Sequence, residues 1–194
     1  MKSARWLLLA GGVLALGFWS VNPGAGQATQ KEKGTLVKID NLESRAPADW
    51  QEEKPNNLTR LKQFRLSPIG DDKDNVELVI FYFGEGQGGS AEENIKRWKG
   101  FFAPPEGKKI EDVAKVQNMK VGDVPVTYLD IHGTYSSKFP PFDPKAKTTR
   151  HPNYRMLGVV FESKKGPYFI RMVGPADTVA QHKKGFDEWL KGFK

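Results

Sequence analysis

The chain has 194 residues, a formal net charge of +7 at pH 7 and no cysteine. This length suits one domain, and the apolar and charged fractions, 38% and 27%, are typical of a globular protein. The lack of cysteine excludes disulfides, zinc–thiolate sites, iron–sulfur ligation, thiol catalysis and a lipid-modified N-terminal cysteine.

The N-terminal 28 residues have the layout of a secretory signal peptide. Lys2 and Arg5 precede an apolar run of 14 residues from Trp6 to Trp19, and small residues lead up to Ala28. This run is shorter than the roughly 18 apolar residues that a membrane-spanning helix needs. We therefore expect cleavage after Ala28 and an exported, periplasmic or extracellular protein, with a retained anchor as the alternative. Cleavage would remove two basic residues and no acid, which lowers the net charge from +7 to +5.

The charges of the remaining chain are mixed in sign, in stretches such as KEKG, DDKDN and SAEENIKRWK. Nucleic-acid binding depends on clustered basic residues, so this mixture favours an ordinary solvated surface. We therefore expect no nucleic acid among the partners of the protein.

Residues 29–34 are polar and are expected to form a flexible N-terminal segment before a single domain at residues 35–194. Strands separated by turn-rich or polar loops are predicted at residues 35–39, 58–66 and 76–83. The last of these, VELVIFYF, is apolar almost throughout. This pattern is typical of a central strand that is covered on both faces.

A glycine-rich stretch follows the third strand, and three of its residues spell the dinucleotide-binding fingerprint G-x-G-x-x-G: Gly84, Gly86 and Gly89. A dinucleotide site needs a βαβ unit and a helix N-terminus free to receive pyrophosphate, but Glu92 and Glu93 fall in the first helical turn. A Walker loop would need lysine in place of Ser90, and a nucleophile elbow would need glycine in place of Glu92. We therefore interpret the glycines as a tight turn and expect no bound cofactor.

Ser90 and Glu93 form a capping box, which predicts a helix that begins at this point. Further along, two strands are predicted to meet at Gly122-Asp123, and a tight antiparallel hairpin is predicted around Gly166. A C-terminal helix is expected from Pro175. Together these elements predict an α+β domain with a mainly antiparallel sheet.

Asp130 and His132 are the first candidates for chemistry. They lie two residues apart on a predicted strand and therefore share a face. Such a pair could begin a metal site or serve in acid–base catalysis, although no third ligand is visible nearby. The alternative is an ordinary solvated strand face.

Residues 136–153 contain four prolines and show no periodicity, which predicts a long loop. Phe139 and the acid Asp143 also lie in this stretch. Basic and aromatic side chains together suit an anionic surface or an acidic protein, and the alternative is a solvated insertion. The candidate partner-binding residues are Lys138, Phe142, Lys145, Lys147, Arg150 and His151.

Four segments resemble small exported bacterial proteins of unknown function and the PsbP-like, or DcrB-like, fold superfamily. These segments are PADWQEEKP, LKQFRL, VELVIFYFGEGQGGSAEENIKRWKGFF and GPYFIRMVGPADTV. The resemblance covers most of residues 35–193 and implies an α-β-α sandwich around a mainly antiparallel sheet. Members of that fold bind very different partners, so the resemblance implies no particular function.

The sequence therefore favours an exported, non-enzymatic binding or accessory protein. Its expected partner is an envelope protein or an anionic surface, and no catalytic residue, cofactor site or metal ligand is assigned. The alternative is a periplasmic hydrolase or metal-dependent enzyme that uses Asp130 and His132.

Overall fold

An antiparallel sheet of eight strands forms the centre of the fold. The computed structural model describes residues 34–55, 57–138 and 145–194, so the predicted signal peptide at residues 1–28 lies outside the described residues. The strands follow the order β3-β4-β5-β10-β9-β8-β6, and β7 also pairs with β8. They are β3 (Gln51–Glu53), β4 (Arg60–Leu66), β5 (Val76–Tyr82), β6 (Phe102–Ala103), β7 (Ala114–Val121), β8 (Val124–Lys138), β9 (Thr148–Ser163) and β10 (Gly166–Pro175).

Two further strands and three helices complete the described chain. The strands β1 (Leu36–Ile39) and β2 (Leu42–Arg45) form a separate two-stranded sheet. The helices are α1 (Ala91–Lys99), α2 (Ile110–Val113) and α3 (Ala176–Lys191). None of these three helices combines the length and the apolar character needed to cross a membrane.

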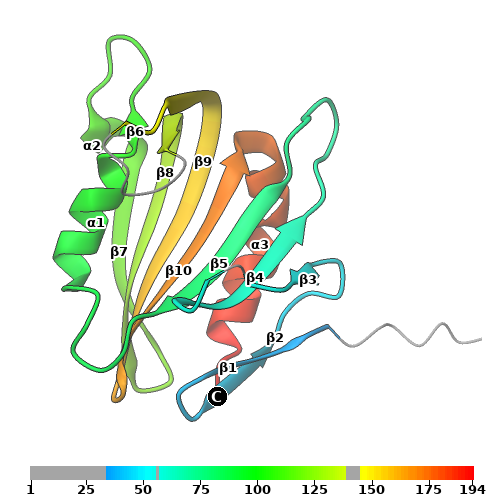
Figure 1. Ribbon diagram of the computed structural model, residues 1–194, viewed down its shortest axis with the longest axis vertical. Helices are drawn as coiled ribbons and strands as arrows, with labels where there is room; N and C mark the ends of the chain where they lie inside the picture. The colour runs from blue at the N-terminus through cyan, green and yellow to red at the C-terminus, as the bar shows by residue number, and fades with distance from the viewer. Residues whose placement is uncertain (1–33, 56, 139–144) are drawn as a thin grey trace, which may run out of the picture. The chain divides into compact units, whose positions relative to one another are not determined.

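The helices α1 and α3 pack on opposite faces of the sheet. Side chains alternate along a strand, so Met156 and Leu157 of β9 point to opposite faces. Met156 belongs to the hydrophobic cluster that contains Trp98 of α1, whereas Leu157 belongs to the cluster that contains Trp189 of α3. Figure 1 shows α3 behind the sheet. The predicted α+β class, with helices on both sides of an antiparallel sheet, is confirmed.

The local signals at the start of α1 are also confirmed. The Ser90 hydroxyl accepts a hydrogen bond from the Glu93 N–H at 3.2 Å, and the Ser90 N–H donates to Glu93 Oε2 at 2.8 Å. Gly84, Gly86 and Gly89 all have positive φ, as the interpretation of this stretch as a turn requires. The strand before this turn, β5, pairs antiparallel with both β4 and β10, which is not the arrangement of a βαβ dinucleotide unit.

Trp50 lies in a stretch that the sequence predicts to be rich in turns, yet its side chain is part of the main core. It is only 4% exposed, and its ring lies 5.4 Å from that of Trp189 and 5.9 Å from that of Phe64. The short strands on either side of it, β2 and β3, were not predicted.

The prediction of a long loop at residues 136–153 is wrong at both ends. The strand β8 continues to Lys138 and β9 begins at Thr148, and these two residues are paired in the ladder. A β-bulge explains how β9 accommodates proline. Pro152 and Asn153 lie opposite the single residue Thr134, where the ladder shifts register and Asn153 has a φ of 55°.

Candidate functional site

The end of the β8–β9 hairpin carries most of the residues predicted to bind a partner. Four of its basic side chains belong to exposed residues, and we call these four the basic hairpin end: Lys138, Lys145, Lys147 and Arg150. Ser136 lies opposite Arg150 in the ladder, and Lys138 is two residues beyond Ser136, so Lys138 and Arg150 share one face. Phe142 lies outside the described residues.

His151 is separated from this group because it lies on the other face of the hairpin, opposite Tyr135. Its ring centroid is 4.9 Å from that of Tyr154, and its Nε2 is 3.0 Å from the hydroxyl oxygen of Ser137. The Tyr135 and Tyr154 rings are nearly parallel, at 3° and 6.1 Å. His151 therefore takes part in an aromatic cluster at the base of the hairpin and does not belong to the exposed basic surface.

The aromatic cluster is fixed to the rest of the fold by a hydrogen bond. The Tyr154 hydroxyl donates to Asp74 Oδ2 at 2.6 Å, and Asp74 lies in the loop before β5. Burial raises the pKa of Tyr154, and the hydrogen bond to Asp74 raises it further. The neutral, donating form of the tyrosine is therefore the stable one at physiological pH.

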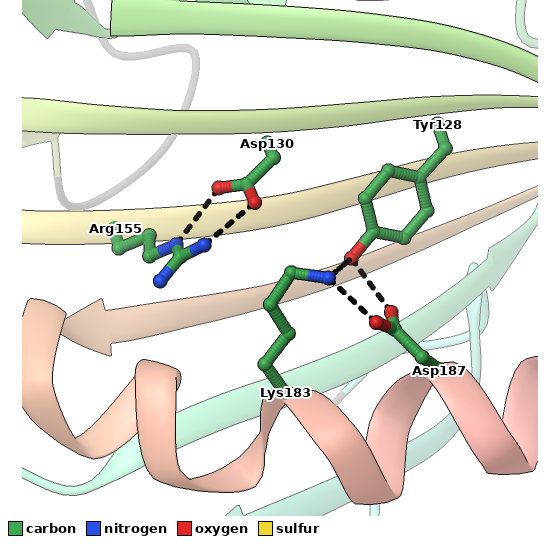
Figure 2. Close-up of polar contacts among 5 residues, drawn as sticks. All are labelled: Tyr128, Asp130, Arg155, Lys183 and Asp187. Carbon is green, nitrogen blue, oxygen red and sulfur yellow. Dashed lines mark hydrogen bonds and ion pairs between the residues drawn. The ribbon is translucent and has the colours of Figure 1, made fainter.

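The candidate pair Asp130 and His132 is not joined in the described chain by any hydrogen bond or ion pair. Asp130 instead accepts two hydrogen bonds from Arg155, from Nε at 2.8 Å and from Nη2 at 2.6 Å, as Figure 2 shows. The bond to Asp130 raises the pKa of Arg155. His132 is exposed and lies directly across the ladder from Arg155. Asp130 thus has its charge balanced, and an acid–base role would require this pair to open.

A second polar group lies close to this pair, between the sheet and α3 (Figure 2). The Tyr128 hydroxyl donates to Asp187 Oδ1 at 2.9 Å, and Lys183 Nζ donates to Asp187 Oδ2 at 2.6 Å. Burial raises the pKa of Tyr128, and the charge of Asp187 acts in the same direction. These hydrogen bonds connect α3 to the sheet, and the raised pKa keeps Tyr128 protonated at physiological pH.

Metal binding finds no support in the described ranges, which contain no group of three or more histidine, aspartate or glutamate side chains placed to hold an ion. A groove of about 840 Å³ lies between α1, α2 and β7. Its lining includes Ile95, Phe102, Ile110 and Val116, with Glu92, Lys96, Lys99 and Glu111 among the charged residues. None of the candidate site residues predicted from the sequence lines this groove.

A scan of protein-family models and a search of curated proteins find no match to the chain. A search of solved structures finds similar folds. The solution structure of the cyanobacterial PsbP protein, CyanoP, from Synechocystis sp. PCC 6803 has a TM-score of 0.49 and 12% identity, over 89% of this chain and 98% of that one. A protein of unknown function from Pseudomonas aeruginosa has a TM-score of 0.43 and 11% identity, over 81% of this chain and 93% of that one. These likenesses concern the fold alone.

Proposed function

We propose that this chain is an exported, non-enzymatic binding or accessory protein that captures an acidic envelope protein through the basic hairpin end. The observation that supports this is a concentration of positive charge at one end of the hairpin. Four exposed basic residues occur at the hairpin end, whereas the sequence of residues 136–153 contains a single acid, Asp143. A cluster of charges of one sign attracts a partner that carries the opposite charge, and it increases the rate at which the two proteins meet.

The secondary structure of the hairpin supports this function better than a structureless loop would. Ordered strands hold Lys138 and Arg150 at a fixed separation on one face, so less conformational entropy is lost when a partner binds. The aromatic cluster of Tyr135, His151 and Tyr154 supports the base of the hairpin.

The export part of the proposal depends on the N-terminal sequence pattern. N-terminal sequencing of the protein recovered from the periplasm of a bacterial host should give Thr29 as the first residue. Recovery of the uncut chain in the membrane fraction would instead support the retained anchor.

The binding part can be tested by charge reversal at Lys138, Lys147 and Arg150. The triple glutamate variant should lose partners captured from envelope extract, while its melting temperature stays within about 2 °C of the original. A control with glutamate at Lys108, Lys115 and Lys120, which are also exposed, should retain those partners. Equal capture by both variants would contradict the proposal. Loss of binding to anionic lipid vesicles, with protein capture unchanged, would identify a membrane surface in place of a protein.

A further inference from the structure

A second charged region lies on the sheet, away from the basic hairpin end. We call it the open face, defined as the side of β4, β5 and β10 opposite α3. Phe169 of β10 packs in the cluster beneath α1, and Arg171, two residues later, lies on the same side of the sheet. Arg60 and Phe81 are opposite one another in the ladder and share this side. In Figure 1, no described helix lies in front of these three strands.

Two guanidinium groups approach one aromatic ring on the open face. The central carbon of the Arg171 guanidinium is 4.9 Å from the centroid of Phe81, and that of Arg60 is 5.6 Å from it. Arg60 is already engaged, because its Nη1 lies 2.7 Å from both Glu77 Oε1 and Gln63 Oε1. Glu77 is thus paired with Arg60, and it forms no ion pair with Arg171 in the described chain.

Arg171 is the unusual member of this group. Across the residues that the structure describes, its side chain makes no hydrogen bond or ion pair, although it is half-buried on a central strand. Within the described ranges, the fully buried side-chain nitrogens without a partner are Arg60 Nε, His182 Nε2 and Trp189 Nε1, so the nitrogens of Arg171 each keep some exposure to solvent. Its donors are therefore available to a ligand.

The surroundings of Arg171 strengthen its attraction for an anion. Burial lowers the pKa of Arg171. The positive charges of Arg60 and Arg97 also lower it, whereas Tyr135 and Glu77 raise it. A charge that is partly removed from water and left without a counter-ion is costly, and a bound anion would relieve that cost. Functional sites are places where such costs are tolerated.

We infer that Arg171 binds the carboxylate of a small organic ligand whose apolar part lies against Phe81 and Phe83. Arg171 presents a guanidinium fork without hydrogen bonds, and two parallel N–H groups match the two oxygens of a planar carboxylate. Arg97 donates to Asn94, so it is already engaged, as Arg60 is. One fork can satisfy both oxygens of a carboxylate but leaves at least one oxygen of a phosphate dianion without a donor, so we assign a carboxylate.

The apolar part of the site consists of two aromatic rings on one side of the sheet. The Phe81 and Phe83 rings are parallel within 2°, with centroids 6.1 Å apart, and Phe83 is 43% exposed. An exposed aromatic surface beside a free guanidinium favours a ligand that has both an apolar body and an acidic group.

Benzoate is a suitable probe, because it combines a carboxylate with an aromatic ring. We expect titration of the purified protein with benzoate to give saturable shifts of the backbone amide NMR signals of β4, β5 and β10. Arg171→Gln should weaken binding at least tenfold, and Arg171→Lys should also weaken it, because lysine keeps the charge but lacks the fork. Arg65→Gln is the matched control. Arg65 lies on the same face but is paired with Glu53 and Gln51, so this variant should bind as the original does.

Several outcomes would overturn the inference. These are non-saturable shifts, equal binding by the Arg171→Gln variant with a dispersed, folded spectrum, or shifts confined to the β8–β9 hairpin. Inorganic phosphate that binds with the same dependence on Arg171 would contradict the preference for a carboxylate. The variants at Arg171 and Arg65 leave the charges of the basic hairpin end unchanged. A negative result for benzoate binding would therefore not bear on the proposed capture of a partner by the hairpin.

Discussion

Asp130 and Arg155 form a two-point ion pair between adjacent strands, with one carboxylate oxygen on Nε at 2.8 Å and the other on Nη2 at 2.6 Å. Their side chains are only 16% and 23% exposed, so water screens the pair weakly. Both oxygens of the Asp130 carboxylate are bound to Arg155, although an enzyme that used Asp130 and His132 would need that carboxylate free. The pair therefore gives Asp130 a role in stabilising the fold.

Breaking this pair from one side should destabilise the protein. Asp130→Ala leaves a largely buried guanidinium without its partner and should lower the free energy of unfolding by about 3 kcal/mol. The double variant with Arg155→Ala should lose less than the sum of the two single variants, with a coupling of about 2 kcal/mol. Urea denaturation of the two single variants and the double variant gives the three free energies of unfolding that this comparison needs. His132→Ala, at an exposed position, should change stability by less than about 0.5 kcal/mol. Additive losses from Asp130 and Arg155 would contradict this account.

The Tyr128–Asp187 hydrogen bond should give the protein a measurable sensitivity to alkaline pH. Because the pKa of Tyr128 is raised in the folded state, its contribution to stability is complete below pH 10, the ordinary value, and falls as pH rises beyond it. Tyr128→Phe should cost about 1 kcal/mol at pH 8. The stability difference between the original and the variant should shrink above pH 10. A difference that is constant from pH 8 to pH 11 would show that the proton of Tyr128 makes no such contribution.

Gly158 should tolerate no side chain, because α1 packs directly against its backbone. A Cβ at this position would lie 2.7 Å from Cε3 and 2.8 Å from Cζ3 of Trp98, whose ring is buried and cannot move aside easily. Gly158→Ala should therefore lower the free energy of unfolding by about 2 kcal/mol. Gly185→Ala on α3 is the control, since its Cβ would meet only Pro47 at 3.4 Å and alanine favours a helix. Thermal melting would separate the two, and equal melting temperatures would refute the prediction.

Removal of the Arg171 charge from the open face should raise the free energy of unfolding, in contrast to the substitutions described above. Arg171→Met removes a half-buried cation that has no counter-ion in the described chain, and it keeps a long apolar side chain against Phe81. In the absence of ligand, this variant should unfold at higher urea concentration, with a gain of about 1 kcal/mol. A loss of similar size would indicate that Arg171 serves mainly to stabilise the sheet.

Elements with local sequence signals were predictable. The apolar run of β5, the capping box at Ser90 and the turn at Gly122 depend on residues that are close in sequence, and the structure confirms each. The ends of β8 and β9 were missed for a physical reason. Beyond Tyr135 these strands extend past the hydrophobic core, so their side chains no longer alternate between apolar and polar.

The chemical surroundings of individual residues were less predictable, because they depend on strand register. Arg155 is 25 residues from Asp130 in sequence, and no spacing rule relates the two. Arg171 lies in the hairpin predicted around Gly166, but its position beside Phe81 and near Arg60 follows only from the pairing of β4, β5 and β10. The sequence therefore indicated the basic hairpin residues, which are neighbours in the chain, and missed the open face, whose residues come from three strands.

The short length of β6 has a consequence for assembly. It covers β8 only at Thr134 and Tyr135, so within the described sheet Ser137 and Lys138 have β9 as their sole strand neighbour. Such an uncovered margin can recruit a strand from another molecule, and lysine there discourages that contact by electrostatic repulsion. Lys138, which we assign to partner capture, would thus also oppose the pairing of this margin with a second copy of the chain.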